Sequence, residues 1–159
     1  MMEKLTTLDR AIRLQKVELF ADLDTDLLAL IASIAEQIEL PEGDTLVAQD
    51  ADQDALYVLL EGRIEMMRDG ATMFSVGPDE TVGNWALFDR QPSLAAVRAA
   101  VACSLLKIDR EDFFDLLADH SEMNRELFQA LFRRMRSVLS KGLNSTKIRR
   151  TNASPAGEG

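Results

Sequence analysis

Between residues 37 and 108 the chain alternates short β-prone segments with turn residues, and this rhythm limits the folds that it can adopt. The predicted strands are 37–40, 45–48, 56–60, 63–68, 71–76, 94–101 and 104–108. Turns about every 8–12 residues are typical of an antiparallel sandwich or barrel, because parallel strands need a long crossover between them. We therefore expect an antiparallel β-structure in the middle of the chain.

Three of the connections between these strands have only two residues, at 61–62, 69–70 and 102–103. Glu61-Gly62 separates 56–60 from 63–68, and Asp69-Gly70 separates 63–68 from 71–76. A two-residue link that ends in glycine favours a β-hairpin, so we predict two hairpins here. The segments 94–101 and 104–108 are expected to form a last strand pair.

Helical spacing of apolar residues predicts helices at both ends of the chain. Residues 5–17 and a segment capped by Asp24 or Thr25 form a predicted N-terminal pair. Asp109 and Ser121 are the expected caps of two C-terminal helices. The predicted division is 1–36 for the N-terminal helical segment, 37–108 for the strands, 109–142 for the C-terminal helices and 143–159 for a disordered basic tail.

The second C-terminal helix carries a wide apolar stripe. Phe128, Leu131, Met135 and Val138 follow heptad spacing, and Leu127, Phe132 and Leu139 widen the stripe. One interpretation is a helix packed on its own strands, and the other is a helix that pairs with its copy. We favour a homodimer through this helix, because the stripe is wider than one packed face needs.

Charge and composition limit the classes of function. The net charge is −9, but residues 1–124 hold 10 Lys and Arg against 25 Asp and Glu, whereas 125–150 hold 8 against one. An acidic body does not favour nucleic acid, while the basic end is a candidate for contact with an acidic partner surface, lipid or nucleic acid. The single cysteine, Cys103, lies in an apolar strand, which predicts a buried thiol in a reducing compartment.

Several other classes are not expected. No apolar run reaches the length of about 18 residues that a membrane span needs, so we expect a cytoplasmic chain without a span. The room after the long helix is too short for a helix-turn-helix, which predicts no DNA-binding domain. A single histidine, His120, with no phosphate-binding lysine loop and no serine elbow, predicts no catalytic residue and no metal site.

An ordered series of residues over positions 18–138 resembles the cyclic nucleotide-binding domain family, in particular its catabolite activator-like sensor domains. The matching residues are Leu19-Phe20, Gly43, Leu56-Tyr57-Val58, Gly62, Gly77, Gly83, Ala86-Leu87, Pro92, Ala95, Val97, Ala99 and Phe113. The resemblance implies an α+β fold, with an antiparallel β-roll of the double-stranded β-helix or jelly-roll type between N-terminal helices and two C-terminal helices. It also implies cAMP or cGMP as the ligand.

Within this resemblance, residues 77–99 match the phosphate-binding cassette. The family pattern is roughly Phe-Gly-Glu, then Ala-Leu, then Pro-Arg before a small residue and Ala. The resemblance implies that backbone N–H groups and the arginine hold the cyclic phosphate, and that the glutamate holds the ribose. Here Asn84 stands at the glutamate position and Ser93 at the arginine position, while Asp50 stands where the family often has glycine.

The predicted ligand-binding residues are Gly83, Asn84, Trp85, Ala86, Leu87, Arg90, Ser93, Leu94 and Ala95. Replacing two charge-assisted contacts costs about 3–6 kcal/mol, or about 10²–10⁴ in affinity. Arg90 is the nearby candidate for a replacement charge, because Arg98 alternates with Val97 and should face outward. Trp85 either packs in the core or stacks on a base.

Two hypotheses for function follow. The first is a non-enzymatic regulatory module with weak or no cAMP or cGMP binding, which acts in signalling or as a dimerisation or docking unit for a protein partner. The alternative is a working cyclic nucleotide sensor that regulates an attached or partner protein.

Overall fold

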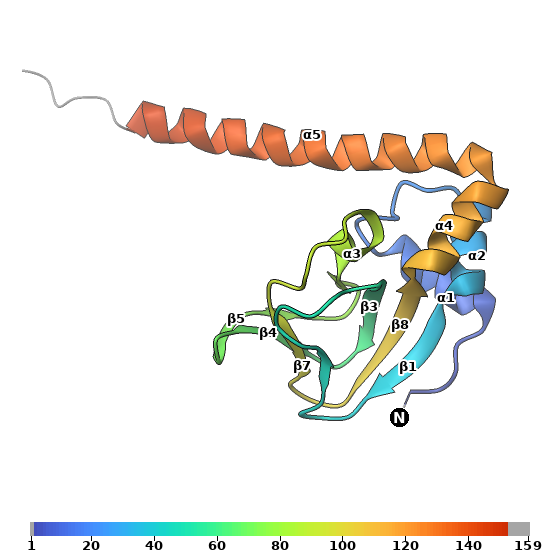
Figure 1. The fold of residues 1–159 in the computed structure, drawn as a ribbon. Coiled ribbons are helices and arrows are strands. Elements are labelled where there is room, and N and C mark those ends of the chain that lie inside the picture. The colour runs from blue at the N-terminus through green and yellow to red at the C-terminus, as the bar shows by residue number, and fades with distance from the viewer. Residues whose placement is uncertain (1, 153–159) are drawn as a thin grey trace, which may run out of the picture.

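The computed structural model describes residues 2–152, with only the backbone described at 84–85 and 145–152. The elements in chain order are α1 (Thr7–Gln15), α2 (Thr25–Ile34), β1 (Glu36–Leu40), β2 (Thr45–Val47), β3 (Ala55–Glu61), β4 (Ile64–Arg68), β5 (Ala71–Val76), β6 (Thr81–Val82), α3 (Asn84–Phe88), β7 (Ala96–Ala99), β8 (Cys103–Asp109), α4 (Arg110–Asp119) and α5 (Ser121–Asn152). Helices α1, α2 and α4 lie together beside the sheet that contains β1, β8 and β3, and α5 runs across the molecule and projects beyond it (Figure 1).

The described strands form two antiparallel sheets that face each other as a β-roll, which confirms the predicted fold class. One sheet has the order β1-β8-β3-β6 and the other the order β2-β7-β4-β5. Strand β3 is buried on both sides. Leu56, Val58 and Leu60 pack on the helices, whereas Tyr57 and Leu59 fill the space between the sheets. This double burial explains why the strand is a continuous apolar run.

One of the two predicted hairpins is confirmed and the other is wrong. Asp69 and Gly70 both have positive φ, +51° and +79°, and join β4 to β5. Glu61-Gly62 instead carries the chain from one sheet to the other, because β3 pairs with β6 and β8 whereas β4 pairs with β5 and β7. Gly62, with φ +106°, allows this crossing where a Cβ would come within 2.6 Å of the carbonyl oxygen of Ala102.

The predicted last strand pair is also wrong. Strand β7 pairs with β2 and β4, and β8 pairs with β1 and β3, so the two strands lie in different sheets. Both segments are apolar and short, and local sequence cannot distinguish a hairpin from a change of sheet. The thiol of Cys103 is buried as predicted, at 2% exposure, and burial raises its pKa.

Two of the three side-chain caps that the sequence predicts are confirmed, whereas Ser121 is itself the first residue of α5. Asp24 accepts from the backbone N–H of Leu27, and Asp109 accepts from Glu111 and Asp112. Thr6 and Asp9 form a reciprocal capping box at the start of α1. These caps fix where α1, α2 and α4 begin, and apolar packing holds the helices against the sheet.

Helix α5 packs on the body only at its beginning. Met123, Leu127 and Ala130 are buried among the other helices, and Leu131 packs partly against them. Arg134 then pairs with Glu18 at 3.7 Å. The predicted disordered tail is wrong for residues 143–152, which continue α5; Gly142 costs only about 1 kcal/mol in a helix, and the next proline is Pro155.

Residues 153–159 of the predicted tail lie outside the described residues. None of the described helices combines the length and the apolar character needed to cross a membrane.

Candidate functional site

The candidate site begins with the glycine turn that leads into α3. Gly83 has φ +84°, and a Cβ at this position would lie 2.6 Å from the carbonyl oxygen of Ala55. The N–H of Ala86 donates to the Gly83 carbonyl at 2.8 Å, and the side chains of Ala86 and Leu87 are fully buried. Glycine is therefore required for α3 to lie directly against β3.

A second attachment of α3 comes from Arg110, a residue that the sequence analysis missed. Its Nε donates to the carbonyl of Ala86, and its Nη2 donates to the carbonyl of Gln53. One guanidinium thus ties α3 and the loop before β3 to the first turn of α4. No local motif distinguishes this arginine, because its partners are backbone groups far away in sequence.

Ser93, at the position of the cassette arginine, uses both its hydroxyl and its backbone in hydrogen bonds to backbone groups of the protein. Its side chain is only 3% exposed, and Oγ donates to the carbonyl of Ala95 at 2.6 Å. The Ser93 N–H donates to Ala51, and the Ser93 carbonyl accepts from the Asp50 N–H, both at 2.8 Å. Asp50 adopts φ +61°, which gives a physical reason for a glycine preference at this position.

The alternation predicted for the strand after Ser93 is confirmed. Ala95 and Val97 face the interior of the roll, and Arg98 is exposed. Arg90 lies exposed in the loop after α3, and the side chain of Leu94 is 76% exposed. Of the predicted binding residues, the structure thus brings Ser93 and Ala95 to the inner side of the cassette and leaves Arg90 and Leu94 at its surface.

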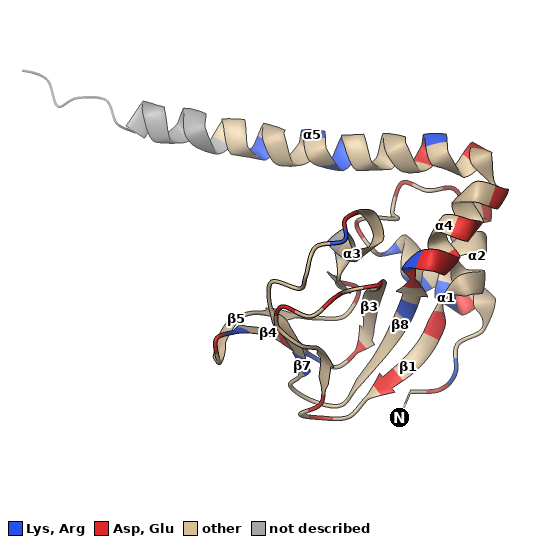
Figure 2. Ribbon diagram, in the orientation of Figure 1, with Lys and Arg blue, Asp and Glu red and all other residues tan. Residues whose placement is uncertain are grey.

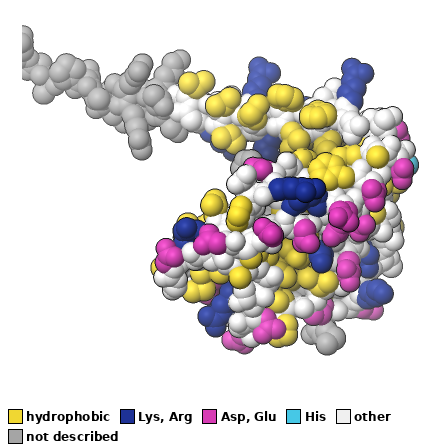
Figure 3. All heavy atoms as spheres, in the orientation of Figure 1, with side chains coloured by type: hydrophobic (Ala, Val, Ile, Leu, Met, Phe, Trp, Pro, Cys, Tyr) yellow, Lys and Arg dark blue, Asp and Glu magenta, His cyan; other side chains and the backbone are white. Residues whose placement is uncertain are grey.

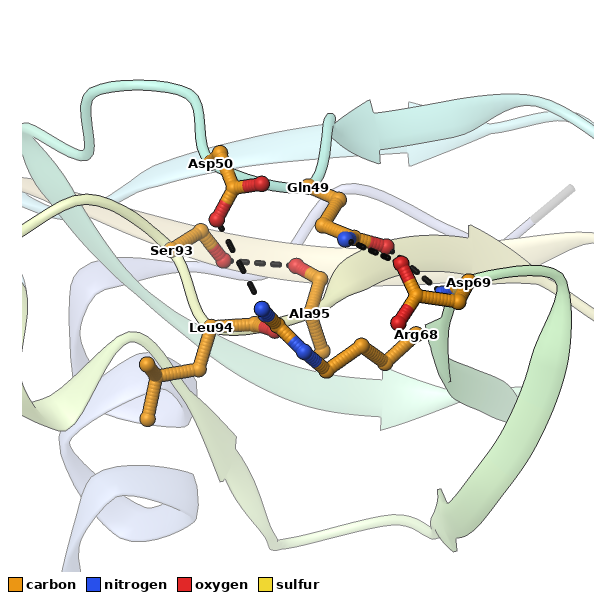
Figure 4. Close-up of polar contacts among 7 residues, drawn as sticks. All are labelled: Gln49, Asp50, Arg68, Asp69, Ser93, Leu94 and Ala95. Carbon is orange, nitrogen blue, oxygen red and sulfur yellow. Dashed lines mark hydrogen bonds and ion pairs between the residues drawn. The ribbon is translucent and has the colours of Figure 1, made fainter.

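A second cationic side chain that contacts the cassette, besides Arg110, is Arg68, which sequence patterns also did not reveal. Figure 4 shows its guanidinium between the carbonyl of Leu94, to which it donates, and the carboxylate of Asp50 at 3.7 Å. Its position depends on strand pairing between β4 and β7, and spacing along the chain gives no sign of that pairing.

The space beside the glycine turn is small. A cavity of about 180 Å³ lies between β2, β3 and their connecting loop. Its lining residues are Leu46, Val47, Ala48, Ala51, Asp52, Gln53, Asp54, Ala55 and Tyr57. Burial, with smaller contributions from the charges of Asp54 and Asp109, raises the pKa of Tyr57. Small-molecule sites usually measure about 300–1,000 Å³, so this cavity is smaller than a nucleotide needs.

A larger groove of about 390 Å³ lies between the segment before α2, strand β5 and α5. Its walls include the carboxylates of Glu18, Asp79 and Glu80 together with Arg134. Three carboxylates against one guanidinium disfavour an anionic ligand here.

Asn84 and Trp85 form the start of α3, but their side chains are outside the described part of the structure. Their predicted roles therefore remain predictions.

The family model for the cyclic nucleotide-binding domain matches residues 37–120, which include both sheets, α3 and α4. This chain belongs to the cyclic nucleotide-binding domain family. Its order of helices, β-roll and C-terminal helices agrees with that membership.

The curated relatives that this chain matches include a kinase regulatory subunit and a transcriptional regulator. The chain is 26% identical over 115 residues to a cAMP-dependent protein kinase regulatory subunit of Yarrowia lipolytica, covering 72% of this chain and 31% of that protein. It is 23% identical over 128 residues to a CRP-like cAMP-activated global transcriptional regulator of Mycobacterium tuberculosis, covering 77% and 57%. The chain thus spans less than two thirds of the length of either relative.

Solved structures show the same fold. The N-terminal domain of a transcriptional regulator from Streptomyces coelicolor superposes with a TM-score of 0.74 at 31% identity, covering 81% of this chain and 94% of that one. A cyclic nucleotide-binding-like protein from Brucella abortus gives a TM-score of 0.62 at 29% identity, covering 69% and 98%.

Proposed function

We propose that this chain is a non-enzymatic regulatory module that keeps the cyclic nucleotide-binding fold, binds cAMP and cGMP weakly or not at all, and associates through α5. The single observation that carries the ligand part is Ser93. Its buried hydroxyl donates to the Ala95 carbonyl, so the cassette position that faces a phosphate presents no charge and its one donor is used. The cavity of about 180 Å³ beside the glycine turn supports the same conclusion.

The alternative function, a working cAMP or cGMP sensor, is favoured by a different observation. Gly83 retains the positive φ of the cassette turn, and Ala86, Leu87 and Ala95 remain buried behind it. The backbone that would hold a phosphate is therefore preserved. Relatives named for cAMP support this alternative.

Equilibrium titration with cAMP and cGMP separates these two functions. Trp85 is the only tryptophan, so its fluorescence is a direct reporter of the cassette, with the thermal unfolding midpoint as a second readout. We expect no saturation of the wild type below about millimolar concentration, and a gain of about 10²–10⁴ in affinity for the double variant Asn84→Glu, Ser93→Arg.

The matched control is Gln129→Glu with Ser137→Arg, which adds the same charges at exposed positions of α5. Circular dichroism checks that each variant folds, because Ser93 is buried. Saturation of the wild type at micromolar cAMP or cGMP would contradict the proposal and favour the sensor.

The dimerisation part of the proposal rests on the outer face of α5. We call the exposed apolar residues of this face the α5 seam: Phe128, Phe132, Met135, Val138, Leu139 and Leu143, each between 52% and 69% exposed. Figure 3 shows hydrophobic side chains gathered along the face of α5 that is turned toward the viewer, with Lys and Arg side chains projecting beside them. The occupant that fits is a second copy, because the exposed apolar residues of the seam have heptad-like spacing.

The structure changes the best test of this dimer. Leu131, in the predicted stripe, packs partly against its own body, so Leu131→Glu would disturb the fold as well as an interface. Phe132→Glu should give a monomer in sedimentation while the far-UV circular dichroism and unfolding midpoint stay unchanged. Ser137→Glu, at an exposed position on the opposite side of α5 from Phe132, is the control and should keep the mass of the wild type. A folded Phe132→Glu variant with the wild-type dimer mass would exclude the seam as the interface.

A further inference from the structure

Arg68 lies on the inner side of the roll, at its open end. The β4–β7 ladder pairs Ile64 with Ala99, Met66 with Val97 and Met67 with Ala96, without a shift of register. Ile64 and Ala99 are buried, and Met66 packs against the interior of the roll. Because side chains alternate along a strand, Arg68 follows Ile64 and Met66 on the inner face. Arg68 follows the last pair of this ladder, and its side chain is 42% exposed, so the row ends at the solvent-accessible edge of the sheet.

The guanidinium has one neutral partner and one charged partner. It donates to the Leu94 carbonyl, next to Ser93, and lies 3.7 Å from the Asp50 carboxylate. Both contacts use Nη1, whereas the group carries five N–H bonds. The side chains of Arg68 and Asp50 are 42% and 68% exposed, so solvent and solutes reach the pair.

The surrounding segments hold Arg68 and Asp50 in this position. Gln49 donates from Nε2 to Asp69 at 2.9 Å and accepts from the Asp69 N–H at 2.8 Å, which fastens the turn after Arg68 to the loop before Asp50. The reciprocal backbone bonds of Ser93 with Asp50 and Ala51 fasten the same loop to the cassette. Three segments far apart in sequence therefore meet around one guanidinium (Figure 4).

We infer that Arg68 is the anion-binding cation of this cassette, and that the Asp50 carboxylate competes with an external anion for it. The ligand class is a phosphate-bearing anion, either free or as the phosphate of a nucleotide. Removing the Asp50 charge frees the guanidinium without disturbing the Leu94 contact. The inference deepens the proposed function, because it names the group that gives the residual affinity and the group that weakens it.

The test is a two-dimensional ¹H–¹⁵N NMR titration of the full chain with three probes: inorganic phosphate, cAMP and adenosine. Asp50→Asn should bind phosphate and cAMP about two- to fivefold more tightly than the wild type, the range expected for an exposed ion pair. Asp44→Asn is the matched control, because it removes the same charge from an exposed residue six positions away that does not line the cavity beside the glycine turn. Arg68→Gln, which keeps amide donors but no charge, should remove the gain in the Asp50→Asn background. Adenosine should respond to none of these changes.

Each outcome decides the inference. Equal gains in Asp50→Asn and Asp44→Asn would show a general charge effect and overturn it, as would full phosphate binding by a folded Arg68→Gln variant. A gain for cAMP without one for inorganic phosphate would place the anion elsewhere and also overturn it. Tight cAMP binding by the wild type would contradict only the proposed weak affinity, because the ratio of the affinities of Asp50→Asn and Asp44→Asn does not depend on the absolute affinity.

Discussion

Arg110, the first residue of α4, donates a hydrogen bond from Nε to the carbonyl of Ala86 in α3. The short cassette helix is therefore attached to the C-terminal helices through a backbone contact and not only through apolar packing. The ring of Phe88 adds an edge contact to Phe113 of α4, with ring centroids 6.1 Å apart. Movement of α4 and movement of α3 are consequently linked.

We expect Arg110→Ala to lower the free energy of unfolding by about 2 kcal/mol, because two carbonyls lose a charged donor in a partly exposed site. The thermal midpoint should fall by about 4–8 °C. Arg110→Lys should recover only part of this loss, since an ammonium does not present the planar fork that bridges Ala86 and Gln53. Arg98→Ala, at an exposed arginine, is the control, and an equal loss there would contradict a specific role for Arg110.

Gly83 and Gly77 give a matched pair of substitutions. Gly83→Ala combines a positive φ with a Cβ 2.6 Å from the Ala55 carbonyl oxygen, so it should cost more than about 2 kcal/mol in urea unfolding. Gly77→Ala should stay within about 0.5 kcal/mol, because no atom lies within 4 Å of its added Cβ. Similar costs at both positions would show that the turn adapts and that contact with β3 does not fix α3.

Tyr57 predicts a loss of stability at alkaline pH. Its pKa in the folded state is raised, chiefly by burial, so the tyrosine of the unfolded chain ionises first. Above the ordinary tyrosine pKa near 10, this ionisation favours the unfolded state and lowers the free energy of unfolding. The stability present below that pH is lost as the pH rises through the folded pKa. Tyr57 is the only tyrosine, so tyrosinate absorbance reports it directly. A folded-state titration at the free-tyrosine pKa, or an unchanged alkaline limb in Tyr57→Phe, would refute this.

The capping box of α1 predicts an effect at acid pH. Hydrogen bonds from the Thr6 side chain and backbone lower the pKa of Asp9 in the folded state. Its contribution is therefore present above the ordinary aspartate pKa near 4 and is lost as the pH falls through the lowered value. Urea midpoints of wild type and Asp9→Asn should differ at neutral pH and converge in acid. A constant difference across that range would mean that the charge plays no part.

Sequence reasoning succeeded where the determining interactions are local. Asp24 and Asp109 were correctly predicted as caps, and Asp69-Gly70 was correctly predicted as a hairpin turn, because each depends on residues within one turn of chain. It failed at Glu61-Gly62, because the choice between a hairpin and a change of sheet depends on what Gly62 packs against. That neighbour, Ala102, is forty residues later.

The same limit applies to the candidate site. Gly83 and Ser93 could be found by position in a pattern, whereas Arg68 and Arg110 could not, since both act on backbone carbonyls of distant segments. On α5, heptad counting included Leu131 in the stripe, but only the structure shows that Leu131 packs on its own body and that the exposed seam runs through Phe132 and Leu139. Which apolar residues of α5 are exposed depends on the direction in which the chain leaves α4, and heptad spacing along the sequence does not determine that direction.

The charges of the molecule are separated in space as well as along the chain. Figure 2 shows Asp and Glu positions on α4 and β1, and Lys and Arg positions along α5. Arg134, paired with Glu18, marks the last ion pair between α5 and the body within the described side chains.

From Arg134 to Asn152 the helix continues for a further length of about 27 Å at 1.5 Å per residue. A rotation of α5 by about 10° about its attachment would displace its far end by about 5 Å, by simple geometry on that length. A change at the Arg134–Glu18 contact that turned α5 by this angle would therefore displace the far end of the helix by nearly the pitch of one helical turn.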